Sequence, residues 1–127
     1  MKIFVVDDSE LDRKILVRAL EKSGVADEIL QAHDGRMALE VLQAQHQHIG
    51  LIFLDWQLPK IDGLEILKRI ARDPETATLP VIMLTSANSP EDEEIAKLLN
   101  PGLAAFLIKP LDPEKAVAAA RSFMKRM

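Results

Sequence analysis

The chain has 127 residues, 48% hydrophobic and 28% charged, and its 16 basic and 20 acidic residues give a formal net charge of −4. This length and composition are typical of one globular domain and exclude a fibrous or disordered chain. The lack of cysteine excludes disulfides, thiolate zinc sites and thiol catalysis, and the acidic balance argues against direct binding to nucleic acid.

The start of the chain predicts neither export nor membrane insertion. Only four apolar residues, 3–6, precede Asp7, whereas a signal peptide needs roughly seven to fifteen. The longest apolar runs, 49–54 and 103–108, are far shorter than the roughly eighteen residues that cross a bilayer. We therefore expect one cytoplasmic domain over residues 1–127 that does not contact a membrane.

Five short apolar runs have the length of strands, at residues 3–6, 28–32, 50–54, 80–84 and 104–108. The segments between them carry apolar residues at helical spacing and are long enough for crossover helices. This alternation predicts a (βα)5 fold, in which helices cover both faces of a parallel five-stranded sheet. In such doubly wound α/β sheets, ligands bind outside the carboxyl ends of the strands.

Capping residues indicate where the helices begin and end. A capping side chain stands three residues before an acid at Ser9, Asp62 and Ser89, and a proline takes the first helical position at Pro113. The first and fourth helices are predicted to end at Ser23-Gly24 and Asn100-Pro101-Gly102. Asp34-Gly35 is interpreted as a turn after the second strand.

Acidic residues follow two of the predicted strands at their carboxyl ends. Asp7 and Asp8 follow the first strand and Asp55 the third, while the second strand ends without a comparable residue. Two charges ~4 Å apart repel by roughly 4 kcal/mol at an effective dielectric of about 20. Three converging carboxylates must therefore bind a cation or hold a proton. Oxygen ligands without cysteine or histidine favour Mg²⁺.

The same edge of the sheet is predicted to carry Thr85 and Lys109, at the ends of the fourth and fifth strands. A metal and Lys109 can neutralise the oxygens of a phosphoryl group while a carboxylate attacks in line. Asp55 is the best candidate nucleophile, because the chain turns just beyond it and presents it between the first and fourth strands. Asp7 and Asp8 then hold the metal.

Four motifs together resemble the receiver domain of bacterial two-component response regulators. They are Val5-Val6-Asp7-Asp8, Leu54-Asp55 with Leu58-Pro59 and Asp62-Gly63, Thr85-Ser86-Ala87, and Lys109-Pro110. Each is weak alone, but they occur in order at the ends of the expected strands and cover the whole chain. The resemblance implies the flavodoxin-like, CheY-like strand order 2-1-3-4-5.

The resemblance also implies a phosphorylation switch. Asp55 would accept a phosphoryl group from a sensor histidine kinase or histidine phosphotransfer protein, and the backbone carbonyl of Gln57 would join Asp7, Asp8 and Asp55 around Mg²⁺. Thr85 and Lys109 would bind the phosphoryl oxygens.

The remaining implied features concern the fifth strand and the output. Phe106 would turn inward with Thr85 as the switch aromatic, and the bond before Pro110 would be cis. The downstream protein target, and whether copies dimerise through the fourth and fifth helices, are left open.

Some features have a simpler interpretation. The apolar run 102–106 replaces acidic residues usual in the family, and we favour packing over a partner interface as its reason. Trp56, the single tryptophan, is expected to pack beside Asp55 and to report bound Mg²⁺ by its emission. The three histidines, His33, His46 and His48, are predicted to lie at the surface.

Two other classes of function have different residue requirements. A phosphatase with an aspartyl-phosphate intermediate generally has a second acid two residues after its nucleophile, where this chain has Gln57. A degenerate receiver that acts only as an interaction module would have lost the acceptor or the lysine, and both are present. We therefore expect a switch that is not an enzyme, apart from catalysing its own phosphorylation and dephosphorylation.

Overall fold

The computed structural model describes residues 1–86 and 90–124. Within this part of the chain, five strands alternate with five α-helices. The strands are β1 (Lys2–Val6), β2 (Ile29–Ala32), β3 (Ile49–Asp55), β4 (Val81–Thr85) and β5 (Leu103–Ile108). The helices are α1 (Glu10–Ser23), α2 (Gly35–Gln45), α3 (Gly63–Arg72), α4 (Pro90–Leu99) and α5 (Pro113–Met124), with a short 3-10 helix η1 (His46–His48) before β3. Each strand begins and ends within one residue of its predicted range.

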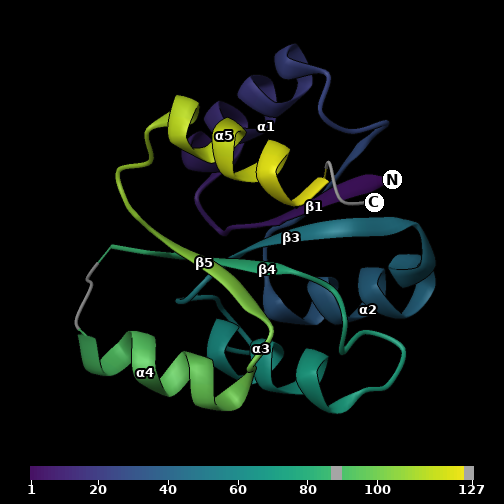
Figure 1. Ribbon diagram of the computed structural model, residues 1–127, viewed down its shortest axis with the longest axis vertical. Helices are drawn as coiled ribbons and strands as arrows, with labels where there is room; N and C mark the ends of the chain where they lie inside the picture. Colours follow the sequence, from purple (N-terminus) through teal and green to yellow (C-terminus); the bar gives the residue numbers. More distant parts are fainter. Residues whose placement is uncertain (87–89, 125–127) are drawn as a thin grey trace.

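The strands form one parallel sheet in the order β2-β1-β3-β4-β5, which confirms the expected strand order and the (βα)5 fold. Helices α1 and α5 cover one face of the sheet, and α2, α3 and α4 cover the other (Figure 1). None of the helices in the described residues is long and apolar enough to cross a membrane.

Each face of the sheet has its own hydrophobic core, because alternate residues of a strand point to opposite sides. In β3, Ile52 and Leu54 pack toward α2, α3 and α4, whereas Leu51 and Phe53 pack toward α1 and α5. All seven residues of β3 are buried, as expected for the central strand of a sheet covered on both faces. The edge strand β5 is only partly buried, but residues 103–106 of the predicted apolar run 102–106 pack against the two cores, which is the role favoured for that run; Gly102 is exposed.

The helix boundaries follow the capping residues with one addition. The Ser9 side chain caps α1 by accepting from the N–H of Asp12 at 3.2 Å, and α1 ends at Gly24, whose φ of 67° suits glycine. Asp34 does more than form a turn: its side chain accepts from the N–H of Met37 at 2.8 Å and caps α2. Asp62 stands at the predicted start of α3, but the prediction that its side chain caps this helix is wrong, because it makes no capping hydrogen bond. Ala87 and the predicted cap Ser89 lie outside the described residues.

The prediction that all three histidines lie at the surface is wrong for His46. Its side chain is only 15% exposed, because η1 turns it back against the end of α2. One ring nitrogen lies 3.1 Å from the carbonyl oxygen of Leu42, and the other lies 3.1 Å from Glu75 Oε2. His33 and His48 are exposed, as predicted.

Candidate functional site

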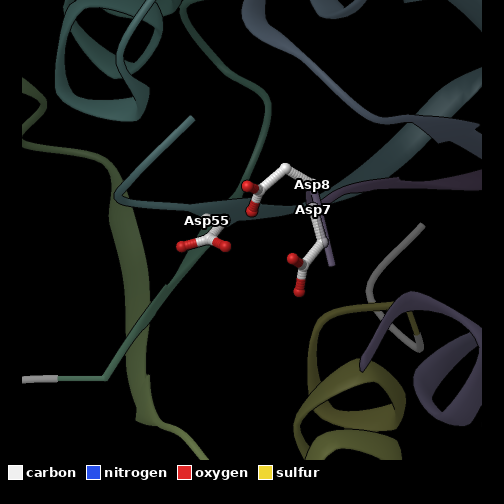
Figure 2. A group of neighbouring side chains, drawn as sticks. All are labelled: Asp7, Asp8 and Asp55. Atoms are coloured by element: carbon white, nitrogen blue, oxygen red, sulfur yellow. The ribbon is translucent and has the colours of Figure 1, made fainter. Parts of the chain in front are cut away.

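Three carboxylates meet at the carboxyl edge of the sheet. Asp7 and Asp8 directly follow β1, and Asp55 is the last residue of β3. These two strands are neighbours in the sheet, with Val6 beside Leu54, so the residues that follow them come together. Carboxylate oxygens of the three residues lie within 4.8 Å of one another. Figure 2 shows the three side chains grouped at the ends of the two strands.

Lys109 partly neutralises this group. Its Nζ lies 2.8 Å from Asp7 Oδ2 and 2.9 Å from Asp55 Oδ2, and its side chain is only 13% exposed. Asp7 and Asp55 are buried, whereas Asp8 is exposed. One ammonium therefore faces two buried carboxylates and leaves the site with a net negative charge.

The pKa values in the site reflect burial and this charge balance. Burial raises the pKa of Asp55 to about 6; the charge of Asp7 also raises it, and the contacts with Lys109 oppose the rise. Burial acts against the charge of Lys109, but its contacts with Asp7 and Asp55 outweigh burial and raise its pKa above the ordinary value. Lys109 is thus held as a cation next to the Asp55 carboxyl group, whose ionisation is disfavoured by burial.

The carboxylate oxygens of Asp7 and Asp55 could still bind a metal ion. Asp7 Oδ1 accepts from the N–H of Ser9 at 2.9 Å, and Asp55 Oδ1 accepts from the N–H of Gln57 at 3.2 Å. Asp7 Oδ2 is buried and within ion-pair distance of Lys109, yet among the described residues it receives no well-oriented hydrogen bond. The ammonium group that faces this oxygen is shared with Asp55 and Asp12, so the oxygen can still accept a cation as a further partner. Carboxylate oxygens of this kind are suitable ligands for a hard divalent cation such as Mg²⁺.

The other predicted residues lie on the neighbouring strands. Thr85 ends β4 and is buried, and its carbonyl oxygen accepts from the backbone N–H of Lys109 at 2.7 Å. Phe106 is partly buried on β5, and its ring centroid lies 5.9 Å from that of Trp56, with 46° between the ring planes. The peptide bond between Lys109 and Pro110 is cis. The fold therefore brings Asp7, Asp8, Asp55, Thr85 and Lys109 to one edge of the sheet, and Phe106 lies further back along β5.

Two residues at the start of α1 also reach the site, and the sequence interpretation missed them. Asp12 Oδ2 lies 3.2 Å from Lys109 Nζ, and Arg13 Nη1 donates to the backbone carbonyl of Asp7 at 2.6 Å. The sequence gives one indication of their role: both follow Asp7 and Asp8 closely, in the first turn of the next helix. Charged residues in a first turn are ordinarily explained by their interaction with the helix terminus, so this indication is easily overlooked.

Comparison with known proteins agrees with this geometry. The family model described as the response regulator receiver domain matches residues 3–121, nearly the whole chain. The chain belongs to the response regulator receiver domain family. This receiver domain is 30% identical to a chemotaxis protein CheY homolog of Campylobacter jejuni, over 90% of the chain and 85% of the relative. It is 36% identical to the phosphate regulon transcriptional regulatory protein PhoB of Pseudomonas aeruginosa, over 98% of the chain and 52% of the relative.

Solved structures show the same relationship. The receiver domain superposes on the chemotaxis protein CheY4 of Vibrio cholerae with a TM-score of 0.83 at 30% identity, covering 96% of this chain and 97% of the other. The match spans the helices as well as the sheet. The fold is therefore that of CheY-like receivers.

Proposed function

We propose that this receiver domain is a phosphorylation-dependent switch of a two-component system, with Asp55 as the phosphoacceptor. The observation that carries the proposal is the buried Asp55 carboxylate, which ends the central strand, lies 2.9 Å from Lys109 Nζ and shares its site with two further acids. A nucleophile next to a fixed cation is suited to phosphoryl transfer, in which positioning and charge neutralisation provide most of the catalysis.

The donor is a phosphohistidine of a sensor kinase or phosphotransfer protein. An Asp55 carboxylate oxygen attacks the phosphorus, the P–N bond of the donor breaks, and the imidazole leaves and takes up a proton from solvent. Lys109 holds the incoming oxygens at the position where it now contacts Asp55. Asp7, Asp8, Asp55 and the Gln57 carbonyl would hold Mg²⁺, which supplies positive charge against the phosphoryl oxygens.

The switch follows from the change in charge and in hydrogen-bond acceptors. A phosphoryl group adds about 1.5 to 2 negative charges at neutral pH and three acceptor oxygens. It gives Thr85 and Lys109 new partners, and Phe106 lies on the strand that ends beside Lys109. Moving a two-state equilibrium from 1:99 to 99:1 takes about 5.5 kcal/mol of differential interaction, so this site alone accounts for a partial shift.

The proposal places the protein in the cytoplasm, with a kinase or phosphotransfer protein upstream and a protein target downstream, and without direct contact to nucleic acid. It acts on its own Asp55 and does not turn over a separate substrate. Gln57 stands where a phosphatase of the aspartyl-phosphate type needs an acid, which argues against that alternative. The presence of both Asp55 and Lys109 argues against a degenerate interaction module.

The test is incubation with Mg²⁺ and acetyl phosphate, followed by mass spectrometry of the intact protein. We expect the native chain to gain one phosphoryl group and Asp55→Asn to gain none. Asp62→Asn is the matched control, because Asp62 is an exposed acid beyond the same strand and its side chain makes no capping bond. Persistent failure of the native chain to label, or labelling of Asp55→Asn, would overturn the proposal. Steady turnover of a phosphate ester would favour the phosphatase instead.

A further inference from the structure

Residues 56–61, here called the acceptor loop, connect Asp55 to α3 and include Gln57, whose carbonyl belongs to the proposed metal site. The position of that carbonyl depends on the path of the loop backbone. Two helices begin directly against this backbone: α2, which starts at Gly35, and α3, which starts at Gly63. At these two glycines the helices lie against the backbone of the loop.

Gly35 lies too close to the acceptor loop for any side chain. Its N–H donates to the carbonyl of Pro59 at 3.2 Å. A Cβ added to Gly35 would lie 2.0 Å from the carbonyl oxygen of Ile61 and 2.7 Å from its carbonyl carbon. Both atoms belong to backbone, so an alanine at this position must displace the loop or the start of α2. Glycine is required here by close approach, since among the chain's glycines only Gly24 has a positive φ.

Asp34 contacts the same part of the loop. Its side chain is 8% exposed, and its Oδ2 lies 3.5 Å from Lys60 Nζ. The N–H of Met37 donates to Asp34 and holds the pKa of that carboxyl below its ordinary value, so the residue is ionised at neutral pH. Lys60 has a φ of 70°, a conformation that L side chains rarely adopt. The loop thus adopts a left-handed backbone conformation at the residue whose side chain contacts Asp34 of the β2–α2 connection.

The other end of the acceptor loop is held from α3. The N–H of Gly63 donates to the carbonyl of Trp56 at 2.9 Å. A Cβ on Gly63 would lie 2.0 Å from the carbonyl oxygen of Asp55 and 2.7 Å from that of Trp56. The loop backbone is therefore fixed from α3 at its beginning and from the β2–α2 connection at its end.

We propose that Asp34, Gly35 and Lys60 are positioning residues, which hold the acceptor loop so that the Gln57 carbonyl and Asp55 keep the geometry needed to bind Mg²⁺. This inference rests on the proposed function and assigns a role to the end of β2, which otherwise contributes no residue to the site. Residues that orient metal ligands without touching the metal typically change metal affinity by about 10- to 100-fold when they are mutated.

The test compares two glycine-to-alanine variants. Gly35→Ala places a methyl group against the loop backbone, whereas Gly24→Ala introduces unfavourable φ at the end of α1, where a Cβ would meet no atom within 4 Å. Both substitutions strain the chain, but only the first strains the acceptor loop. The measurements are the Mg²⁺ dissociation constant by calorimetry and the hydrogen exchange, without metal, of the backbone amides of residues 57, 58, 60 and 61; Pro59 has no amide proton.

We expect Gly35→Ala to weaken Mg²⁺ binding by about tenfold or more and to speed exchange of the loop amides, and Gly24→Ala to leave both unchanged. Equal dissociation constants and equal loop exchange in the two variants would overturn the positioning role. If the native chain neither binds Mg²⁺ nor labels at Asp55, the proposed function itself fails. If the native chain does both but the two variants do not differ, only the positioning role fails.

Lys60→Gly provides an independent measurement if Gly35→Ala does not fold. Glycine adopts the φ of Lys60 without strain but removes the ion pair with Asp34. We expect a folded protein whose loop amides exchange faster and whose Mg²⁺ affinity is a few-fold weaker. Exchange and affinity identical to those of the native chain would contradict the inference.

Discussion

The ring of Trp56 packs against the ring of Phe106, with centroids 5.9 Å apart. Trp56 directly follows Asp55 at the end of β3, and Phe106 lies on β5, three residues before Lys109. The two rings therefore join the loop that leaves Asp55 to the strand that supplies the lysine. An aromatic pair of this kind contributes about 0.5–1.5 kcal/mol beyond the area that it buries.

This pair predicts an optical signal for the switch. In the native protein, Mg²⁺ should change the emission of Trp56 through Asp55, and beryllofluoride should change it further as Phe106 moves. In Phe106→Leu we expect the response to Mg²⁺ to remain and the further response to beryllofluoride to decrease by about half or more, because the ring contact is lost. Fluorescence titration of both proteins measures this. An undiminished second response in the variant would show that Trp56 senses the phosphoryl analogue without Phe106.

The raised pKa of Asp55 predicts that its charge destabilises the metal-free fold. The pKa is about 6 in the folded protein, against 3.8 for an ordinary aspartate side chain. Between these pH values the folded chain binds more protons than the unfolded chain, so the contribution of Asp55 to the free energy of unfolding falls as the pH rises through this window. At pH 7.5 in EDTA, Asp55→Asn should be more stable than the native protein by about 1–2 kcal/mol, after allowance for solvent screening.

Urea unfolding of both proteins at pH 7.5 and near pH 4 measures this difference. Near pH 4 the folded native protein carries a protonated Asp55, so the gap between the two proteins should nearly close. A gap that is the same at both pH values would show that the variant acts through packing and not through the charge.

Lys109 is expected to matter for stability as well as for phosphoryl transfer. Lys109→Met leaves Asp7 and Asp55 buried without their cation, which should destabilise the protein by about 2–4 kcal/mol at pH 7.5 without metal. Added Mg²⁺ should recover part of this loss, because it also neutralises the acids. Thermal unfolding with and without Mg²⁺ measures the effect. Lys115→Met, an exposed lysine on α5, is the control and should change the unfolding temperature little.

Asp12 is predicted to slow the phosphorylation of Asp55. It is a third carboxylate within 3.2 Å of Lys109 Nζ, and its side chain is 39% exposed. Its charge repels an incoming phosphoryl donor and competes for the lysine. Asp12→Asn should therefore label with acetyl phosphate about 2–5-fold faster than the native protein at low ionic strength, and the difference should shrink as salt is added. The rates of labelling of both proteins at two salt concentrations test this prediction. If Asp12→Asn labels more slowly than the native protein, Asp12 instead holds Lys109 in the position needed for phosphoryl transfer.

The fold and the main site residues could be predicted because they depend on local pattern. Each strand is a short apolar run, and Asp55 and Lys109 directly follow such runs, so the parallel topology alone brings them to one edge. The residues that were missed depend on contacts between distant segments. Gly35 resembled an ordinary turn residue, and its contact with Ile61 exists only once α2 has packed beside the acceptor loop. His46 resembled a surface residue because nothing nearby in the sequence indicates Glu75.

The arrangement of the elements also bears on how the chain emerges from the ribosome. Asp7, Asp8 and Asp55 are all synthesised before Lys109, which is reached only after β5, a strand at the margin of the sheet. A nascent chain that ends before β5 holds its acids without the ammonium group that lies between two of them in the finished protein. Burying Asp55 at that stage favours its protonated form or a captured cation. Lys109 directly follows this last strand, so its ammonium group reaches Asp7 and Asp55 only when the whole sheet can form.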